Sequence, residues 1–385
     1  MTVVVTGLGA VSCFGNGTAA LWDGLLHADR RPAPAPENCG CPVPPHLYAV
    51  PDSAGATEHT APAGTPPAGR TSALLTTAVA EAVEEAGLTA DDLREAGLTV
   101  GTSLGDIDLA ERPGASAPQP ATHQVTAVLA GRFGISGPSQ TLSTACSAGS
   151  YAVGWGAELI ETGQADIVVA CGGDAFSRVA IGTLQRFGLV DPEYCRPFDA
   201  DRTGMVTGEG AAALVLESEA SARRRGRPAQ AVLAGHGWSC DAHHPMAPEP
   251  SGQQLHRAAA QALTDTEPPG AVVLHRAGVA GNDTVETAAI ARAAADAGEP
   301  ELIGYAPKAV MGHTAGGAGV FGCLIAALIL RHRLVPPNAH VSTLDPECRL
   351  RVPLDGPAPL PRPSVLVSGT GFGGNNATLT WRAAA

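Results

Sequence analysis

The stretch TACSAG, residues 144–149, places Cys146 between small residues at the start of a predicted helix, residues 147–162. A helix dipole favours a thiolate at the helix start, so the position predicts a lowered pKa for Cys146 and a nucleophilic role. The small neighbours would let a thioester approach. Taken alone, the pattern fits a buried structural cysteine better than a nucleophile.

Predicted strands and helices alternate on both sides of this stretch. Strands are predicted at residues 1–12, 98–101, 166–171, 211–217, 271–274, 364–368 and 377–381. Helices are predicted at residues 71–86, 121–133, 147–162, 253–263, 284–297 and 314–331, and residues 31–68 read as an irregular loop. This alternation predicts an α/β fold with layered helices, and its recurrence in both halves indicates an internal duplication.

Composition narrows the possible partners of this 385-residue chain. A net charge of −13 argues against nucleic acids and anionic membranes. An acidic protein partner would need a local basic patch, which the RRRGR run at residues 223–227 could supply; the alternative is a solvated helix end.

Neither a membrane anchor nor a cysteine framework is expected. The N-terminus lacks a signal-peptide pattern, and the longest apolar run, residues 320–330, is too short to span a bilayer. A soluble, cytoplasmic protein is therefore expected. The nine cysteines form no CxxC pair, so no zinc site or disulfide framework is predicted, and Cys39 and Cys41 are expected to be plain thiols.

Three further motifs carry residues suited to catalysis. His275 ends an apolar strand, where α/β sheets place ligand-binding residues, although a core histidine would fit as well. His313 precedes an apolar helix and follows Lys308, the only lysine in the chain. An arginine cannot replace a compact ammonium at a tight buried site, which is a reason for this lysine to persist. The turn GFGGNN, residues 371–376, can present backbone N–H groups to an anion.

Together these motifs resemble the elongating β-ketoacyl-acyl carrier protein synthases of the thiolase superfamily, including those of type II polyketide and fatty acid pathways. The resemblance covers nearly the whole chain and includes VTGLGAV at residues 5–11, RPFDADR at 196–202, GEG at 208–210 and DAHH at 241–244. It implies a thiolase-like fold of duplicated halves in α-β-α-β-α layers. The N-terminal half, residues 1–228, would carry Cys146, and the C-terminal half, residues 229–385, would carry the histidines and the lysine.

The resemblance also implies a role for each site residue. Cys146 would accept the acyl chain, His275 and His313 would stabilise the enolate formed by decarboxylation, and Lys308 would organise the site. The backbone N–H groups of Cys146 and Phe372 would form the oxyanion hole, with Phe372 also gating the pocket. The supporting residues would be Glu286 and Gly373.

The implied partners are malonyl and acyl thioesters, an acyl carrier protein, and a second subunit. That subunit would be an identical chain or a related ketosynthase or chain length factor, paired through the strand at residues 166–171. No metal or redox cofactor is expected. The phosphopantetheine arm of the carrier protein would only deliver the substrate.

The sequence departs from the family in three places. Arg276, Ala277, Gly278 and Val279 stand where the family has Gly-Thr-Gly-Thr, so the two threonines that bind the prosthetic arm are missing. The stretch between residues 102 and 137 looks short, and Thr370 replaces a common phenylalanine. Substrate and chain length are therefore left open.

Two other functions compete with condensation. One is a thiolase-fold acyltransferase that uses Cys146 without decarboxylation; the other is a non-catalytic subunit resembling a chain length factor. Retention of Cys146 argues against the second, because such subunits usually lack the cysteine.

Overall fold

The computed structural model describes residues 1–36, 39, 45–52, 54, 67–112, 114, 121–299 and 301–384. Within these ranges the largest sheet has eleven strands. Apart from β2 (Gly15–Asn16), which pairs antiparallel with the end of β1, they form two wings of five. The first wing runs in the order β1 (Val3–Ser12), β9 (Gly210–Ser218), β7 (Ile167–Asp174), β5 (Gly97–Gly101) and β6 (Ser139–Leu142). The second wing runs β10 (Ala231–Cys240), β16 (Asn375–Ala383), β15 (Ser364–Gly371), β11 (Ala271–Val273) and β12 (Ile303–Tyr305).

The two wings have the same strand directions. In each wing the first two pairings are antiparallel and the last two are parallel. The wings meet where β1 pairs antiparallel with β10. This symmetry confirms the predicted duplicated α/β architecture. The expected boundary at residues 228/229 falls in the loop between α8 (Glu219–Arg224) and β10.

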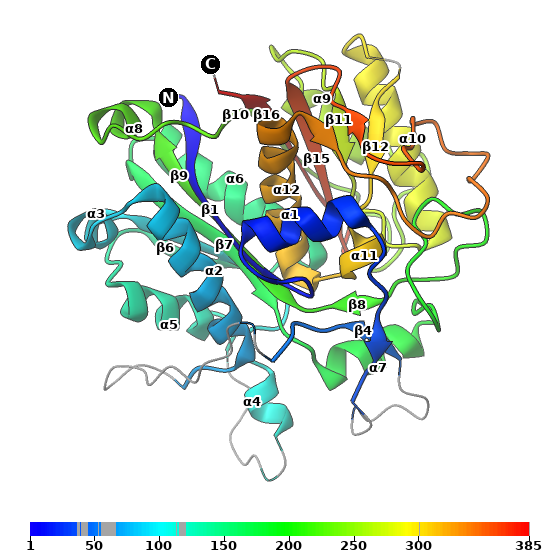
Figure 1. Ribbon diagram of the computed structural model, residues 1–385, viewed down its shortest axis with the longest axis horizontal. Helices are drawn as coiled ribbons and strands as arrows, with labels where there is room; N and C mark the ends of the chain where they lie inside the picture. The colour runs from blue at the N-terminus through cyan, green and yellow to red at the C-terminus, as the bar shows by residue number, and fades with distance from the viewer. Residues whose placement is uncertain are drawn as a thin grey trace.

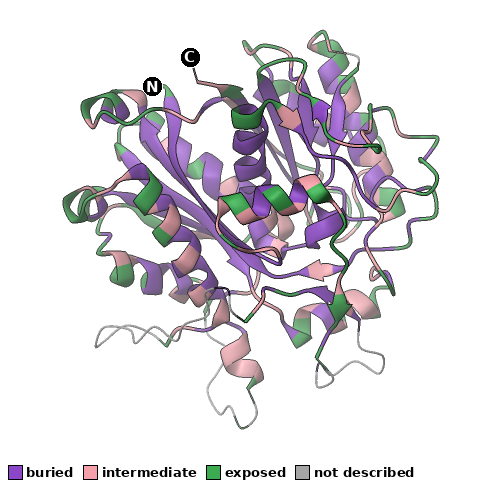
Figure 2. Ribbon diagram, viewed as in Figure 1, coloured by how far each residue is buried: buried purple, intermediate pink, exposed green. Residues whose placement is uncertain are grey.

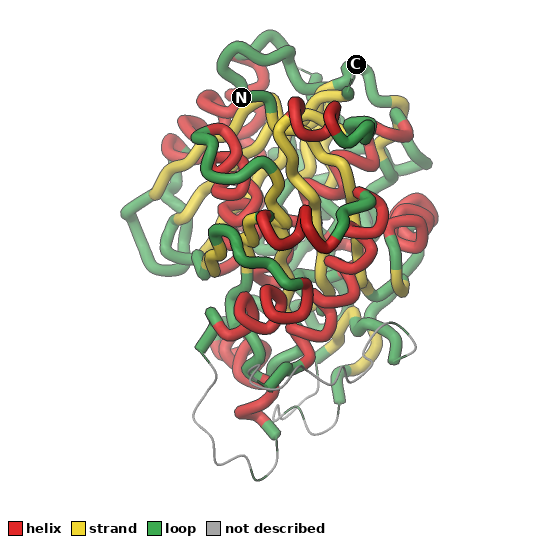
Figure 3. Tube along the Cα trace, turned by 90° about the vertical axis from the view of Figure 1, so that its left-hand side faces the viewer, coloured by secondary structure: helices red, strands yellow, loops and turns green. Residues whose placement is uncertain are grey.

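Helices form three layers around the wings (Figures 1 and 3). The central layer consists of α6 (Ala148–Glu161) and α12 (Ala318–His332), which contact strands of both wings. The outer layers are α2 (Arg70–Ala86) with α5 (Gln124–Phe133) on the first wing, and α9 (Gln253–Ala262) with α10 (Ala280–Asp296) on the second. The order of layers is therefore α-β-α-β-α, as the resemblance implied.

The remaining elements are short and lie around this frame. The helices are α1 (Thr18–His27), α3 (Ala90–Glu95), α4 (Asp108–Glu111), α7 (Arg178–Arg186) and α11 (Lys308–Met311), with single 3₁₀ turns η1 (Ala145–Ser147) and η2 (Ala315–Gly317). The strands are β3 (Ala33–Pro34), β4 (His46–Tyr48), β8 (Thr207–Gly208), β13 (Leu334–Val335) and β14 (Ala358–Pro359). Short strands β3 and β4 thus lie within the expected loop at 31–68; Cys41 and most of that loop lie outside the described residues.

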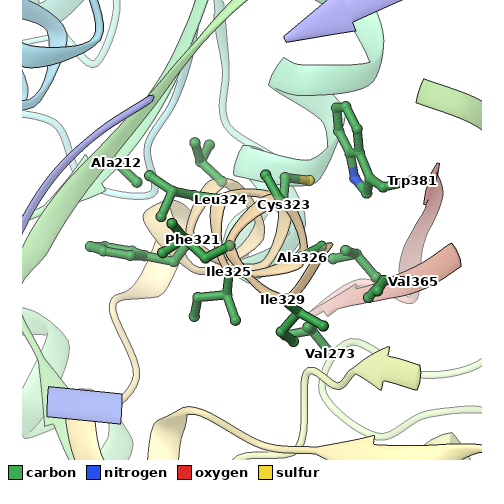
Figure 4. Packing of buried hydrophobic residues seen from close by; sticks show 14 of the residues in the cluster. Ala212, Val273, Phe321, Cys323, Leu324, Ile325, Ala326, Ile329, Val365 and Trp381 are labelled. Carbon is green, nitrogen blue, oxygen red and sulfur yellow. The ribbon is translucent and has the colours of Figure 1, made fainter. Parts of the chain in front are cut away.

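Helix α12 is the centre of the core. Every residue from Gly319 to Leu330 is buried, and Ile325, Cys323 and Leu324 lie among side chains from both wings (Figures 2 and 4). In the described part of the chain, only the segment 315–332 is long and apolar enough to cross a membrane. Because it is enclosed between the two wings, it is a core helix of a soluble protein.

The prediction that the strand at residues 166–171 pairs across a dimer axis is wrong. These residues, except Asp166, lie in β7, which is hydrogen-bonded to β5 on one side and to β9 on the other. It has no free edge to offer a second chain. The free edge of the first wing is β6, whose Ser139 and Gln140 are exposed.

The basic run at residues 223–227 is largely paired with carboxylates. Arg223 lies 2.9 Å from Glu219, Arg224 lies 3.0 Å from Asp166, and Arg225 lies 2.9 Å from the buried Glu217. These ion pairs favour the interpretation of the run as a helix end.

Two glycines, Gly149 and Gly319, allow α6 and α12 to cross at close range. A Cβ at Gly319 would lie 2.2 Å from the backbone nitrogen of Ser150, and one at Gly149 would lie 2.7 Å from the carbonyl oxygen of Gly316. We expect Gly319→Ala to lower the free energy of unfolding by about 1–3 kcal/mol, because backbone must move to admit the methyl group.

The matched control is Gly182→Ala in α7, where nothing lies within 4 Å of the added Cβ. This change should be neutral or stabilising by about 0.5–1 kcal/mol, since alanine favours the helix. Urea denaturation measures both variants. Equal stability of Gly319→Ala and the wild type would contradict the close crossing.

Candidate active site

Cys146 lies in a tight turn between β6 and α6. Ala145 before it has a φ of 52°, a left-handed conformation that is uncommon for alanine. The 3₁₀ turn η1 then leads into α6, so the thiol stands at a helix entrance as predicted. Cys146 lines a cavity of about 120 Å³ together with His275, His313 and Phe372. The fold thus brings together four residues that are widely separated in the sequence.

The expected lowering of the Cys146 pKa is wrong for the unliganded protein. Burial raises the pKa of the thiol to about 11, although the nearby Lys308 ammonium lowers it and the Asp174 carboxylate raises it. A buried thiolate loses its hydration, and in this site that loss outweighs the attraction of the lysine. The resting residue at neutral pH is therefore a thiol.

The two histidines face each other beside the thiol. Their ring centroids are 5.1 Å apart and the rings are nearly perpendicular, at 89°. Burial, followed by the Lys308 charge, holds the pKa of each well below its usual value. Both are neutral imidazoles at pH 7, and each has one N–H to donate. Neither ring nitrogen of the buried His313 has a hydrogen-bond partner among the described residues.

The backbone of His275 is held from both sides. Glu286, on α10, accepts the N–H groups of His275 at 2.7 Å and Arg276 at 2.8 Å. The Nζ of Lys308 donates to the carbonyl oxygen of His275. Ser368 of β15 donates its hydroxyl to Glu286 at 2.6 Å. These contacts fix the position of the imidazole, since the residue that carries it cannot shift without breaking buried hydrogen bonds.

Lys308 lies behind the site instead of lining the main cavity. It is buried, with 4% of its surface exposed, and burial lowers its pKa to about 8. It lines a smaller neighbouring cavity with His275 and Met311. The lysine therefore acts on the site through the His275 backbone and through its charge.

The glycine turn after β15 contributes Phe372 but not Gly373 to the cavity wall. Gly373 is exposed and has a φ of 84°, and its N–H donates to the carbonyl of Pro245 at 2.7 Å. Asn375 donates to the carbonyl of Phe372 at 3.1 Å. Gly373 thus shapes the turn that presents Phe372.

Sequence reasoning assigned no role to several residues that the structure places at the site. Asp174, at the end of β7, lines the cavity and is 2% exposed. Asp283 accepts the N–H groups of Ala277 and Gly278 at 3.0 Å each, and burial raises its pKa to about 6. A polar residue at the carboxyl end of an apolar strand was a usable signal for Asp174. Nothing in the sequence marked Ser368.

The cavity wall is mostly apolar beyond these groups. Side chains from the first half include Leu104, Phe176, Ile181, Leu184 and Met205; those from the second half include Pro248, Leu255, Ala277, Val279, Val285 and Thr370. The replacements noted at residues 277, 279 and 370 thus all face the cavity. Within the described ranges no group of three His, Cys, Asp or Glu side chains is arranged to hold a metal ion.

Known proteins have similar sequences and a similar fold. Residues 1–222 match the family model for the N-terminal domain of β-ketoacyl synthases, and residues 230–342 match that for the C-terminal domain. A putative polyketide β-ketoacyl synthase 1 of Streptomyces halstedii is 34% identical over 97% of this chain and 96% of its own length. The tetracenomycin polyketide synthase ketoacyl synthase alpha subunit of Streptomyces glaucescens is 30% identical over 97% of this chain and 95% of its own length.

A solved structure titled the ishigamide ketosynthase/chain length factor agrees closely with this fold. Its matching chain is 33% identical, with a TM-score of 0.88, covering 100% of this chain and 99% of that one. The paired family domains, the full-length relatives and the shared architecture lead to one conclusion: the chain belongs to the β-ketoacyl synthase family.

Proposed function

We propose that this enzyme catalyses the decarboxylative Claisen condensation of a malonyl thioester with an acyl chain carried on Cys146, in a type II polyketide or related fatty-acid-like pathway. The observation that carries the proposal is the pair of neutral imidazoles at 5.1 Å, both lining the cavity that the Cys146 thiol also lines. Two neutral N–H donors suit an oxygen that becomes negative during the reaction.

The first half-reaction loads the acyl chain. The sulfur of Cys146 attacks the carbonyl carbon of an acyl thioester, and the carrier's thiol leaves with the proton that Cys146 gives up. The backbone N–H groups of Cys146 and Phe372 are proposed to bind the oxyanion of the tetrahedral intermediate. The apolar side chains from the first half, including Ile181 and Leu184 of α7, would cover the acyl chain.

The second half-reaction forms the carbon–carbon bond. The malonyl thioester loses carbon dioxide, and the electron pair of the broken bond forms an enolate whose oxygen accepts hydrogen bonds from His275 and His313. The enolate carbon then attacks the acyl carbonyl, and the sulfur of Cys146 leaves as a thiolate that takes up a proton from solvent. Glu286 and Lys308 would keep His275 aligned throughout. These steps call for no metal or redox cofactor, and we propose that the enzyme uses none.

The proposed partners are an acyl carrier protein and a second subunit in the cytoplasm. One solved neighbour is a type II acyl-carrier protein in complex with its ketosynthase, and another is a ketosynthase in complex with its chain length factor. For this chain we propose pairing through the free edge of β6, either with itself or with a related subunit. The arm of the carrier protein would pass Ala277 and Val279, which offer apolar contact in place of hydroxyl groups.

The histidines and the cysteine should separate into two functions. We expect His275→Ala and His313→Ala to reduce malonyl decarboxylation by roughly 10²–10³, the usual cost of losing an oxyanion donor, while Cys146 still becomes acylated. Carbon dioxide release measures the first reaction and intact mass with peptide mapping measures the second. His256→Ala, which removes a partner of Asp296 outside the cavity, is the control.

Acylation at another cysteine, with Cys146 unmodified, would contradict the proposed nucleophile. Equal loss of both half-reactions in the histidine variants would indicate a general-base role instead. Acyl transfer without consumption of malonyl groups would favour the non-condensing acyltransferase.

Condensation should require both the size and the charge of Lys308. We expect Lys308→Arg to fold but to lose most condensation, because a broad planar guanidinium does not fit the buried site. Lys308→Met keeps the stem but removes the donor to His275, and it should lose activity as well. Steady-state rates beside thermal melting curves test this; a fully active Lys308→Arg enzyme would rule out the proposed role.

The edge of β6 should control assembly. We expect Gln140→Asp with Leu142→Asp to weaken pairing with a second chain, because charges facing an intermolecular strand pair are unfavourable. Light scattering at micromolar concentration should show a dimer, with itself or with its partner, only for the wild type. Two aspartates in the interior strand β7 cannot serve as a control, because they would unfold the sheet. The folded control is therefore Gly182→Ala, whose added Cβ has nothing within 4 Å. An unchanged dimer in the variant would place the interface elsewhere.

A further inference from the structure

The turn that carries Cys146 has a structural twin in the second half of the chain. TACSAG at residues 144–149 corresponds to TAGGAG at residues 314–319. Ala145 has a φ of 52° and Ala315 has a φ of 45°; each begins a 3₁₀ turn, η1 or η2, which leads into a central helix. In this correspondence Gly316 takes the place of Cys146. The sheet order supports it, since η1 and α6 follow β6 as η2 and α12 follow β12.

The second turn has no room for a side chain at Gly316. A Cβ there would lie 2.5 Å from the backbone nitrogen of Ser103 and 2.6 Å from the Cα of Thr102. The N–H of Gly316 instead donates to the carboxylate of Asp174 at 2.7 Å. A backbone N–H that corresponds to a proposed oxyanion donor in the first turn is thus already bound to an anion in the second.

Asp174 receives three more hydrogen bonds. Its Oδ1 accepts the Thr102 hydroxyl at 2.6 Å and the Leu104 N–H at 3.0 Å, and its Oδ2 accepts the Ser103 N–H at 2.9 Å. Four donors on one buried carboxylate join the loop after β5, the end of β7 and the second turn. His313 stands three residues before Gly316, so the hydrogen bond from Gly316 to Asp174 fixes the backbone close to His313 in the chain.

We infer that Asp174 is a positioning residue for condensation: it is the built-in anion of the second turn, it holds the segment that carries His313, and it keeps a negative charge beside Cys146. This role rests on the proposed condensation. The two turns would then have different roles. The N–H of Cys146 in the first turn binds the transient oxyanion, whereas the N–H of Gly316 in the second turn is always bound to Asp174, which keeps that turn rigid.

The charges around the thiol make the inference measurable. Lys308 lowers the pKa of Cys146 and Asp174 raises it, while the neutral His275 and His313 add no charge and Glu286 lies behind His275. Burial raises the pKa of Asp174 itself, and its hydrogen bonds lower it. Because four donors hold the Asp174 carboxylate as the anion of this proposal, its neutralisation must make the Cys146 thiol more acidic.

The test compares Asp174→Asn with the wild type in two assays. An asparagine NH₂ would face two donors wherever it points, the N–H groups of Ser103 and Gly316 or the Thr102 hydroxyl and the Leu104 N–H. We expect malonyl decarboxylation to fall by about tenfold or more, since misplaced catalytic groups lose rate steeply. We expect the pH midpoint for iodoacetamide alkylation of Cys146 to fall by about one unit.

Asp191→Asn is the matched control, because Asp191 is also buried and accepts two N–H groups and a threonine hydroxyl, yet lies outside the cavity. It should lose stability without moving the alkylation midpoint. Thr102→Val keeps the Asp174 charge and removes one tether, so it should lower decarboxylation and leave the midpoint within about 0.3 units of the wild type.

An unchanged midpoint in Asp174→Asn would overturn the proposed charge, and full decarboxylation in Thr102→Val would overturn the positioning role. If Asp174→Asn does not fold, Thr102→Val still tests the positioning role of Asp174 through decarboxylation. A fall in the alkylation midpoint of Thr102→Val would contradict the proposed charge of Asp174. Alkylation needs no condensation activity. A wild-type enzyme that alkylates but never decarboxylates malonyl thioesters would therefore refute the proposed function and not the charge beside Cys146.

Discussion

The close crossing of α6 and α12 is the contact on which the site depends. Gly149 and Gly319 bring the two helix starts within backbone contact, which no larger residue would permit. Because Cys146 precedes one helix and His313 precedes the other, this crossing sets the distance between the nucleophile and one of the imidazoles. The apolar length of α12 then anchors the crossing between both wings of the sheet (Figure 4).

Burial dominates the electrostatics of the site. It raises the pKa of the Cys146 thiol to about 11, lowers that of Lys308 to about 8, and keeps both histidines neutral. The low-polarity cavity makes each remaining donor more effective toward a developing oxyanion. The helix start alone therefore does not create a resting thiolate. Nucleophilic attack therefore requires the Cys146 thiol to lose its proton.

The replacement of the arm-binding threonines has a structural counterpart. Arg276, beside Ala277, is buried and donates to the carbonyl of Pro197 through Nε at 2.8 Å, with its guanidinium 4.5 Å from the Phe198 ring centroid. Asp283 holds the N–H groups of Ala277 and Gly278 and lies 3.6 Å from Arg276. The buried ion pair between Arg276 and Asp283 thus fixes this loop. The side chains that the loop presents to the cavity, Ala277 and Val279, are apolar.

The sequence by itself determined the α/β class and most element positions, because strand and helix periodicity are written along the chain. Its resemblance to the β-ketoacyl synthases, and not periodicity, singled out Cys146, His275, His313 and Lys308. It could not decide which edge of the sheet is free, the actual pKa of the thiol, or the role of Asp174. Strand β7 looks the same in sequence whether it is central or at an edge, since both of its faces are buried in either case. Desolvation and the four donors on Asp174 come from segments up to 142 residues away, so only the tertiary structure brings them together.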